Sequence, residues 1–249
     1  MQVSPYTWSL RERAVRNLCR AEEEGLLGGL TVILTGSAVS PYADSRSGVD
    51  LIFVHPPGWE GEGELRSFLE REGIHLQVVE VGRFALRLRE GDDEALAAVL
   101  EGDFLREGAG GRGDLLALLP PPEELWGRKA RGAWREMRRR RASLAWALRR
   151  GQLLYALENV VRFLEAASAL TLYLSSRPLP HRKWLLQAAL RTKEGQKIRP
   201  LVYRLLSSLG DLALLGGSYS LRRNRVYNLL GEIEALLRPS LKEGRGDKE

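Results

Sequence analysis

Residues 35–54 read TGSAVSPYADSRSGVDLIFV, and this stretch decides the fold that we expect for the first half of the chain. An apolar, β-branched run precedes it, and a second apolar run, residues 51–54, ends it, so two strands flank a polar connection. Gly36 lets the backbone pass close to a ligand, and Ser37 offers a hydroxyl and free backbone N–H groups to phosphate oxygens. Asp50 opens the second strand, where its carboxylate can hold a divalent cation against those phosphates. The stretch therefore predicts a phosphate-binding turn without a P-loop lysine.

These residues resemble the signature of the polymerase-β nucleotidyltransferase superfamily. That signature is an apolar strand, Gly-Ser, about nine further residues, then Ser-Asp-x-Asp-Leu and a second apolar strand. Gly36 and Ser37 match the Gly-Ser pair, Ser47 matches the serine before the acids, and Asp50 matches the second acid. The resemblance implies that Gly36 and Ser37 bind the phosphates of a nucleotide.

The chain departs from the family pattern at its acidic residues. Gly48 stands where the family has its first acid, and Glu80 is the best match to the third acid, which lies on a later strand. The resemblance implies that Asp50 and Glu80 are catalytic and bind Mg²⁺ or Mn²⁺, and that the Ser37 hydroxyl and both carboxylates converge on one cleft. Losing the first acid should weaken both metals of a two-metal centre, unless Asp44 folds back to replace it.

The resemblance implies transfer of a nucleoside monophosphate from a Mg-bound nucleoside triphosphate to a hydroxyl group. We expect the transferred group to be AMP and the triphosphate to be ATP. The acceptor stays open between a small molecule, a protein and RNA. Gly48 supports a second hypothesis, a catalytically silent relative that binds nucleotide or RNA or acts as a regulatory protein. A purely structural helical protein with an accidental motif is a third. Whether the chain is an enzyme is therefore open.

The first half of the chain alternates strand and helix signals. Apolar and β-branched runs indicate the strands, and apolar residues at helical spacing indicate the helices. We expect helices at residues 7–26, 63–72 and 92–100, and strands at residues 31–34, 51–54, 75–81 and 84–88.

The second half carries helix signals only. A glycine-rich segment at residues 108–113 and three prolines at 120–122 indicate a boundary, and we divide the chain into a nucleotidyltransferase-like domain, 1–115, and a helical bundle, 116–249. The predicted fold class is α+β, a mixed-sheet domain followed by an all-α bundle. Helices are expected at residues 123–149, 152–176, 181–192, 198–214 and 220–237, and the second of these, with a narrow polar stripe, should be central.

Charge separates the two halves. Residues 1–120 contain 12 arginines, no lysine and 20 acidic residues, a net charge of −8, whereas residues 121–249 contain 26 basic and 12 acidic residues, a net charge of +14. A basic half attracts polyanions such as a nucleoside triphosphate or RNA, although solvated arginine-rich helices give the same count. We assign phosphate binding to the four consecutive arginines of the first long helix: Arg138, Arg139, Arg140 and Arg141.

The composition limits the class of protein. A single cysteine excludes an internal disulfide, and the most apolar stretch, residues 152–174, is interrupted by charged residues, so we expect a cytoplasmic protein without a membrane span. Arginine greatly outnumbers lysine, and the thermolabile residue types are scarce, which fits a thermophilic source and a GC-rich genome equally well. A homodimer is an open alternative to a monomer.

Overall fold

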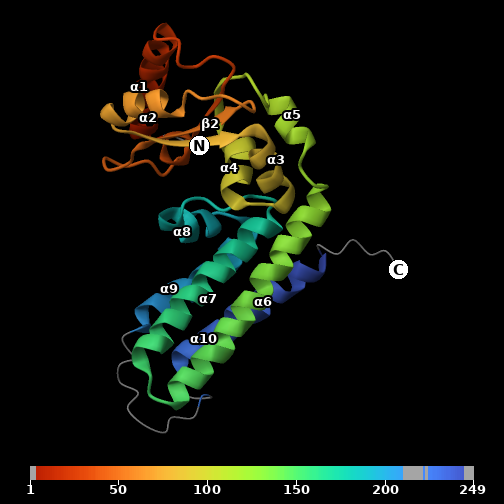
Figure 1. Ribbon diagram of the computed structural model, residues 1–249. Coiled ribbons are helices and arrows are strands. Elements are labelled where there is room, and N and C mark those ends of the chain that lie inside the picture. Colours follow the sequence, from red (N-terminus) through yellow and green to blue (C-terminus); the bar gives the residue numbers. More distant parts are fainter. Residues whose placement is uncertain (1–3, 210–220, 222–223, 244–249) are drawn as a thin grey trace. The chain divides into compact units, whose positions relative to one another are not determined.

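The computed structural model describes residues 4–209, 221 and 224–243 (Figure 1). The chain divides into two compact units, Met1–Pro120 and Pro121–Glu249. The first unit holds every strand of the described residues, and in the second unit those residues form helices and the connections between them. The fold is therefore α+β.

A four-stranded mixed sheet forms the centre of the first unit. Its strands are β1, Thr31–Thr35, β2, Val49–His55, β3, Ile74–Glu80, and β4, Asp103–Arg106. The order is β3-β2-β1-β4, with β1 antiparallel to both β2 and β4 and with β2 parallel to β3. The strands expected around residues 31–34, 51–54 and 75–81 are confirmed.

Helices cover both faces of this sheet because β1 and β2 are apolar on both sides, as strands buried on two faces must be. Leu34, Leu51 and Phe53 share a core with α1 and α2, and the opposite face packs against α3 and α4. The helices of the unit are α1, Pro5–Glu23, η1, Gly36–Val39, α2, Glu62–Arg71, α3, Val81–Glu90, α4, Asp93–Glu101, and α5, Arg112–Ala117.

The strand expected at residues 84–88 is wrong, because this segment lies in α3. Phe84 and Leu88 are fully buried, whereas Leu86 is 55% exposed. A strand would point all three side chains to one face, but a helix brings only residues four apart together. Gly91, in the left-handed conformation with φ of 78°, ends the helix, and the side chain of Asp92 caps the next one by accepting from the backbone N–H of Ala95.

The second unit is a helical bundle around α7. In the described residues its helices are α6, Pro122–Arg149, α7, Leu153–Leu174, η2, Arg182–Trp184, α8, Leu185–Ala189, α9, Lys193–Ser207, and α10, Arg225–Glu243. Helix α7 contacts α6, α8, α9 and α10, so the expected central helix is confirmed. No helix of the described residues is long and apolar enough to cross a membrane.

The helix expected at residues 181–192 is shorter and irregular, and the next one begins earlier than expected. The hydroxyl of Thr192 accepts from the backbone N–H of Gly195, which is the arrangement of an N-cap, so α9 begins at Lys193. Residues 210–214, at the end of the helix expected at 198–214, lie outside the described residues, as do residues 220, 222 and 223 of the helix expected at 220–237.

The burial pattern of α3 gives a test of helix against strand. Phe84→Ala should lower the free energy of unfolding by about 3–5 kcal/mol, because it removes a fully buried aromatic ring. Leu86→Ala should change it by less than about 0.5 kcal/mol, because Leu86 lies on the solvent side of the helix. Chemical denaturation of the full chain, followed by circular dichroism, measures both. Equal losses of stability in the two variants would indicate that Phe84 and Leu86 lie on the same face, as in a strand.

Candidate functional site

The turn between β1 and β2 has a backbone that only glycine fits. Gly36 has a φ of 65°, and a Cβ atom at this position would collide with the carboxylate of Asp50. Thr35 and Asp50 are register partners, and the Thr35 hydroxyl donates to the Asp50 carbonyl oxygen at 3.3 Å. Ser37, 7% exposed, follows in η1. The structure thus brings together three of the predicted residues, Gly36, Ser37 and Asp50.

Glu80 does not join this group, so the predicted convergence of its carboxylate with that of Asp50 is wrong. In the parallel pairing of β2 with β3, Asp50 pairs with His75 and Glu80 pairs with His55. Glu80 therefore lies five positions farther along, roughly 16 Å at the usual rise per residue. Because side chains alternate along a strand, Glu80 also points to the other face of the sheet. It is exposed there, at the start of α3.

His75 stands beside Asp50 where a third acid would be needed. The register places the two residues side by side on adjacent parallel strands, facing the same side of the sheet. A Cβ atom at Gly48 would lie 3.3 Å from Cδ2 of His75, so the place of the missing first acid borders the imidazole. The sequence alone did not single out His75, because its relation to Asp50 depends on the strand register.

Asp44 takes part in the turn of its own loop. Its carboxylate accepts from the backbone N–H of Arg46 at 3.0 Å and from the hydroxyl of Ser47 at 2.9 Å. The hydroxyl of Ser47 accepts in turn from the backbone N–H of Asp44 at 3.0 Å. These bonds give Asp44 and Ser47 a structural role in closing the connection between the two strands.

The donor set does not fit a two-metal centre. Among the described residues no group of three or more His, Cys, Asp or Glu side chains is placed to hold a metal ion. Gly48 supplies no side-chain oxygen, and Glu80 lies at the far end of the strands. Asp50 is thus the one carboxylate among the predicted metal ligands that lies at the Gly36–Ser37 turn.

Two of the four consecutive arginines in α6 bind a carboxylate of α10. Arg141 donates to Glu234 at 2.8 Å and lies over the ring of Tyr227, 4.6 Å from its centroid. Arg138 approaches the same carboxylate at 3.5 Å. Glu234 is nearly buried, so these contacts compensate a charge that would otherwise be costly to bury. They give Arg138 and Arg141 a structural role, and phosphate binding by them stays a prediction.

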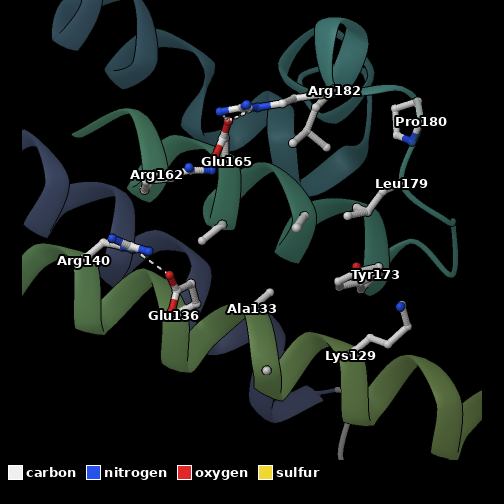
Figure 2. Close-up of a pocket in the computed structure, with 14 residues that line it drawn as sticks. Lys129, Ala133, Glu136, Arg140, Arg162, Glu165, Tyr173, Leu179, Pro180 and Arg182 are labelled. Atoms are coloured by element: carbon white, nitrogen blue, oxygen red, sulfur yellow. Dashed lines mark hydrogen bonds and ion pairs between the residues drawn. The ribbon is translucent and has the colours of Figure 1, made fainter. Parts of the chain in front are cut away.

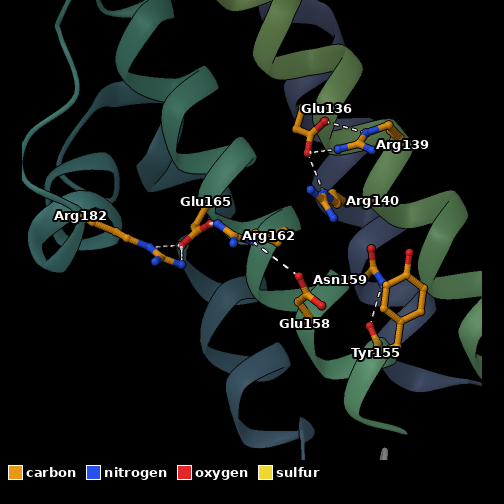
Figure 3. A network of polar contacts seen from close by, with 9 residues as sticks. All are labelled: Glu136, Arg139, Arg140, Tyr155, Glu158, Asn159, Arg162, Glu165 and Arg182. Atoms are coloured by element: carbon orange, nitrogen blue, oxygen red, sulfur yellow. Dashed lines mark hydrogen bonds and ion pairs between the residues drawn. The ribbon is translucent and has the colours of Figure 1, made fainter. Parts of the chain in front are cut away.

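The other two arginines bind Glu136 in the same helix. Arg140 donates to Glu136 at 2.6 Å at the edge of a pocket in the helical unit (Figure 2). Arg139 donates to Glu136 through two nitrogens, at 2.7 and 2.8 Å, and is 62% exposed (Figure 3). The hydrogen bond from Arg139, together with that from Arg140, outweighs partial burial and lowers the pKa of Glu136 to about 2.

Comparison with known proteins gives a distant likeness only. No protein-family model matches the chain, and no curated protein matches it. Among solved structures it is similar to a nucleotidyltransferase-like protein from Exiguobacterium sibiricum 255-15. The two are 15% identical with a TM-score of 0.46, and the match covers 93% of this chain and 78% of that one. At this level the likeness says nothing of activity.

Rebuilding the acids tests the register around Asp50. Gly48→Asp with His75→Asp should place three carboxylates together, because the second change removes the imidazole that a side chain at position 48 would meet, and should tighten Mn²⁺ binding at least about tenfold. Asp50→Ala in that background should remove the gain, and Glu80→Gln should leave it unchanged. Titration followed by electron paramagnetic resonance measures free Mn²⁺. Loss of the gain in the Glu80→Gln variant would show that the register is wrong.

The lowered pKa of Glu136 predicts how stability depends on pH. A carboxylate whose pKa falls on folding contributes stability that is complete above its ordinary pKa of 4.5 and is lost as the pH falls toward 2. Glu136→Gln should therefore be less stable than the wild type at neutral pH, by an amount that shrinks between pH 4.5 and about 2. Urea denaturation of both proteins across this range measures it. A difference that is constant down to pH 2 would contradict the ion pairs.

Proposed function

We propose that the first unit binds a nucleoside triphosphate, with ATP as the expected nucleotide, as its Mg²⁺ complex at the Gly36–Ser37 turn. In this proposal the unit is a nucleotidyltransferase-type domain whose transfer activity is weak or absent. The observation that carries it is the placement of a single carboxylate, Asp50, against the backbone of Gly36.

The electrostatics of the unit favour the nucleotide with its cation over the bare anion. Residues 1–120 have a net charge of −8, and the Asp50 carboxylate lies directly at the turn, so free phosphate oxygens would be repelled. Mg²⁺ is commonly held by one or two carboxylates together with the phosphates of a substrate. In the complex, Asp50 would hold the ion and the Ser37 hydroxyl would donate to a phosphate oxygen, and a bound Mg²⁺ would supply charge neutralisation of the phosphates.

The same geometry disfavours efficient transfer. Two-metal chemistry requires carboxylates on both sides of a pair of cations. In this chain the position of the first acid is a glycine, Gly48, and Glu80 lies on the other face of the sheet. We therefore favour nucleotide binding over transfer of AMP to a hydroxyl acceptor. Transfer is the alternative outcome of the test below.

Calorimetric titration of the full chain with ATP and Mg²⁺ tests the proposal. The wild type should bind, Asp50→Asn should weaken binding at least about tenfold through loss of a charged ligand, and Glu80→Gln should leave it unchanged. The two variants each remove one carboxylate charge, which makes Glu80→Gln a matched control. Incubation with ATP labelled at its α-phosphate, with Mg²⁺ or Mn²⁺, should give transfer at background level.

Three outcomes would contradict the proposal in different ways. Absence of Mg–ATP binding would remove the nucleotide site altogether. Strong transfer that Asp50→Asn abolishes would show an active nucleotidyltransferase at this turn. Strong transfer that Asp50→Asn leaves unchanged would place the active site elsewhere in the chain.

A further inference from the structure

A pocket of about 630 Å³ lies within the helical unit, between α6, α7 and the segment that runs into α8 (Figure 2). Its volume is in the range of small-molecule sites, which is roughly 300–1,000 Å³. Small residues leave the space open where larger side chains would fill it. They are Gly132 and Ala133 of α6 and Ala166 and Ala169 of α7.

Charged side chains from three elements line one part of this pocket. Arg162 of α7 and Arg182 of η2 both donate to Glu165, at 3.1 and 2.6 Å (Figure 3). Arg140 of α6 joins them from the other side, paired with Glu136. The ion pair of Arg182 ties the 177–185 segment to α7 and holds a guanidinium at the pocket wall.

The other part of the pocket is largely apolar. Tyr173, Leu179, Pro180 and Leu185 line it, and Figure 2 shows the first three gathered away from the Arg140–Glu136 pair. Lys129 lies over the Tyr173 ring, with its ammonium nitrogen 4.9 Å from the centroid. A bound molecule would therefore meet three arginines on one side and a mainly apolar wall, bordered by Lys129, on the other.

The lining residues carry an excess of positive charge. Four are basic, Lys129, Arg140, Arg162 and Arg182, and two are acidic, Glu136 and Glu165. Glu136 also accepts hydrogen bonds from Arg139, which does not line the pocket. The negative charge of Glu136 is therefore partly neutralised from outside the pocket. Guanidinium groups bind carboxylates and phosphates through two parallel hydrogen bonds, so an anionic group of a ligand can share or replace Glu165 as their partner.

We propose that this pocket binds a small organic anion, with its carboxylate or phosphate group at the arginines and an apolar body against Tyr173, Leu179 and Leu185. All of its lining residues belong to the helical unit, and it shares none with the nucleotide site proposed at Gly36 and Ser37.

Calorimetry on the full chain tests this proposal with probes that contain the head, the body or both. Phenyl phosphate should bind at least about tenfold more tightly than inorganic phosphate or phenol, because only the joined molecule uses both ends of the pocket. Benzoate in a parallel titration shows whether a carboxylate serves as the head. The Asp50→Asn variant should bind these probes as the wild type does, so the result is independent of the nucleotide site.

Two pairs of variants locate the binding. Ala133→Leu fills the pocket and should abolish binding, whereas the same change at Ala142, an exposed residue of α6, should not. Arg182→Gln should weaken binding at least about tenfold, and Arg149→Gln should not, because Arg149 is an exposed residue of α6 outside the lining. No saturable binding of phenyl phosphate or benzoate, or binding that survives Ala133→Leu, would overturn the proposal.

Discussion

The carboxylate of Asp50 and the Cα atom of Gly36 lie so close that a methyl group at Gly36 would not fit between them. This contact requires glycine at the end of β1, because the backbone there is left-handed, and it requires β2 to begin beside β1 with Asp50 opposite Thr35. The antiparallel pairing then gives the sheet apolar residues on both of its faces. Helices α1 and α2 cover one face, and α3 and α4 cover the other. The candidate site and the core of the first unit thus follow from one constraint.

The pairing of β2 with β3 decides which side chains the site can use. A parallel register brings residues at the same level of the two strands together, and at the level of Asp50 that residue is His75. An acid at the end of β3 is displaced along the strand and turned to the other face, whatever its sequence context. Of the predicted metal ligands, Asp50 alone lies at the turn, and this is why we propose binding of a cation that arrives with its nucleotide rather than a two-metal centre.

The sequence predicted the elements that local patterns determine. Two apolar runs, one before Gly36 and Ser37 and one after Asp50, predicted β1 and β2. The lack of strand patterns after residue 122 predicted the helical second half. It failed where the answer depended on tertiary packing. Phe84, Leu86 and Leu88 alternate in sequence with smaller or polar residues as in a strand, but only Phe84 and Leu88 are buried, which is the pattern of the helix α3. Glu80 matched a motif in type and order, yet its register could not be known before the strands were paired. The sequence showed that α6 carries basic arginines, but it did not show that these arginines form ion pairs with Glu136 and Glu234.

Nuclear magnetic resonance with Mn²⁺–ATP tests most directly whether the nucleotide site is built on Asp50. The paramagnetic ion broadens the amide signals of nearby residues, so its position can be read from the backbone. We expect broadening centred on Gly36, Ser37, Asp50 and His75, with the signals at the far end of β3 around Glu80 retained. Broadening centred on Glu80, or confined to the helical unit, would contradict a nucleotide site at the Gly36–Ser37 turn.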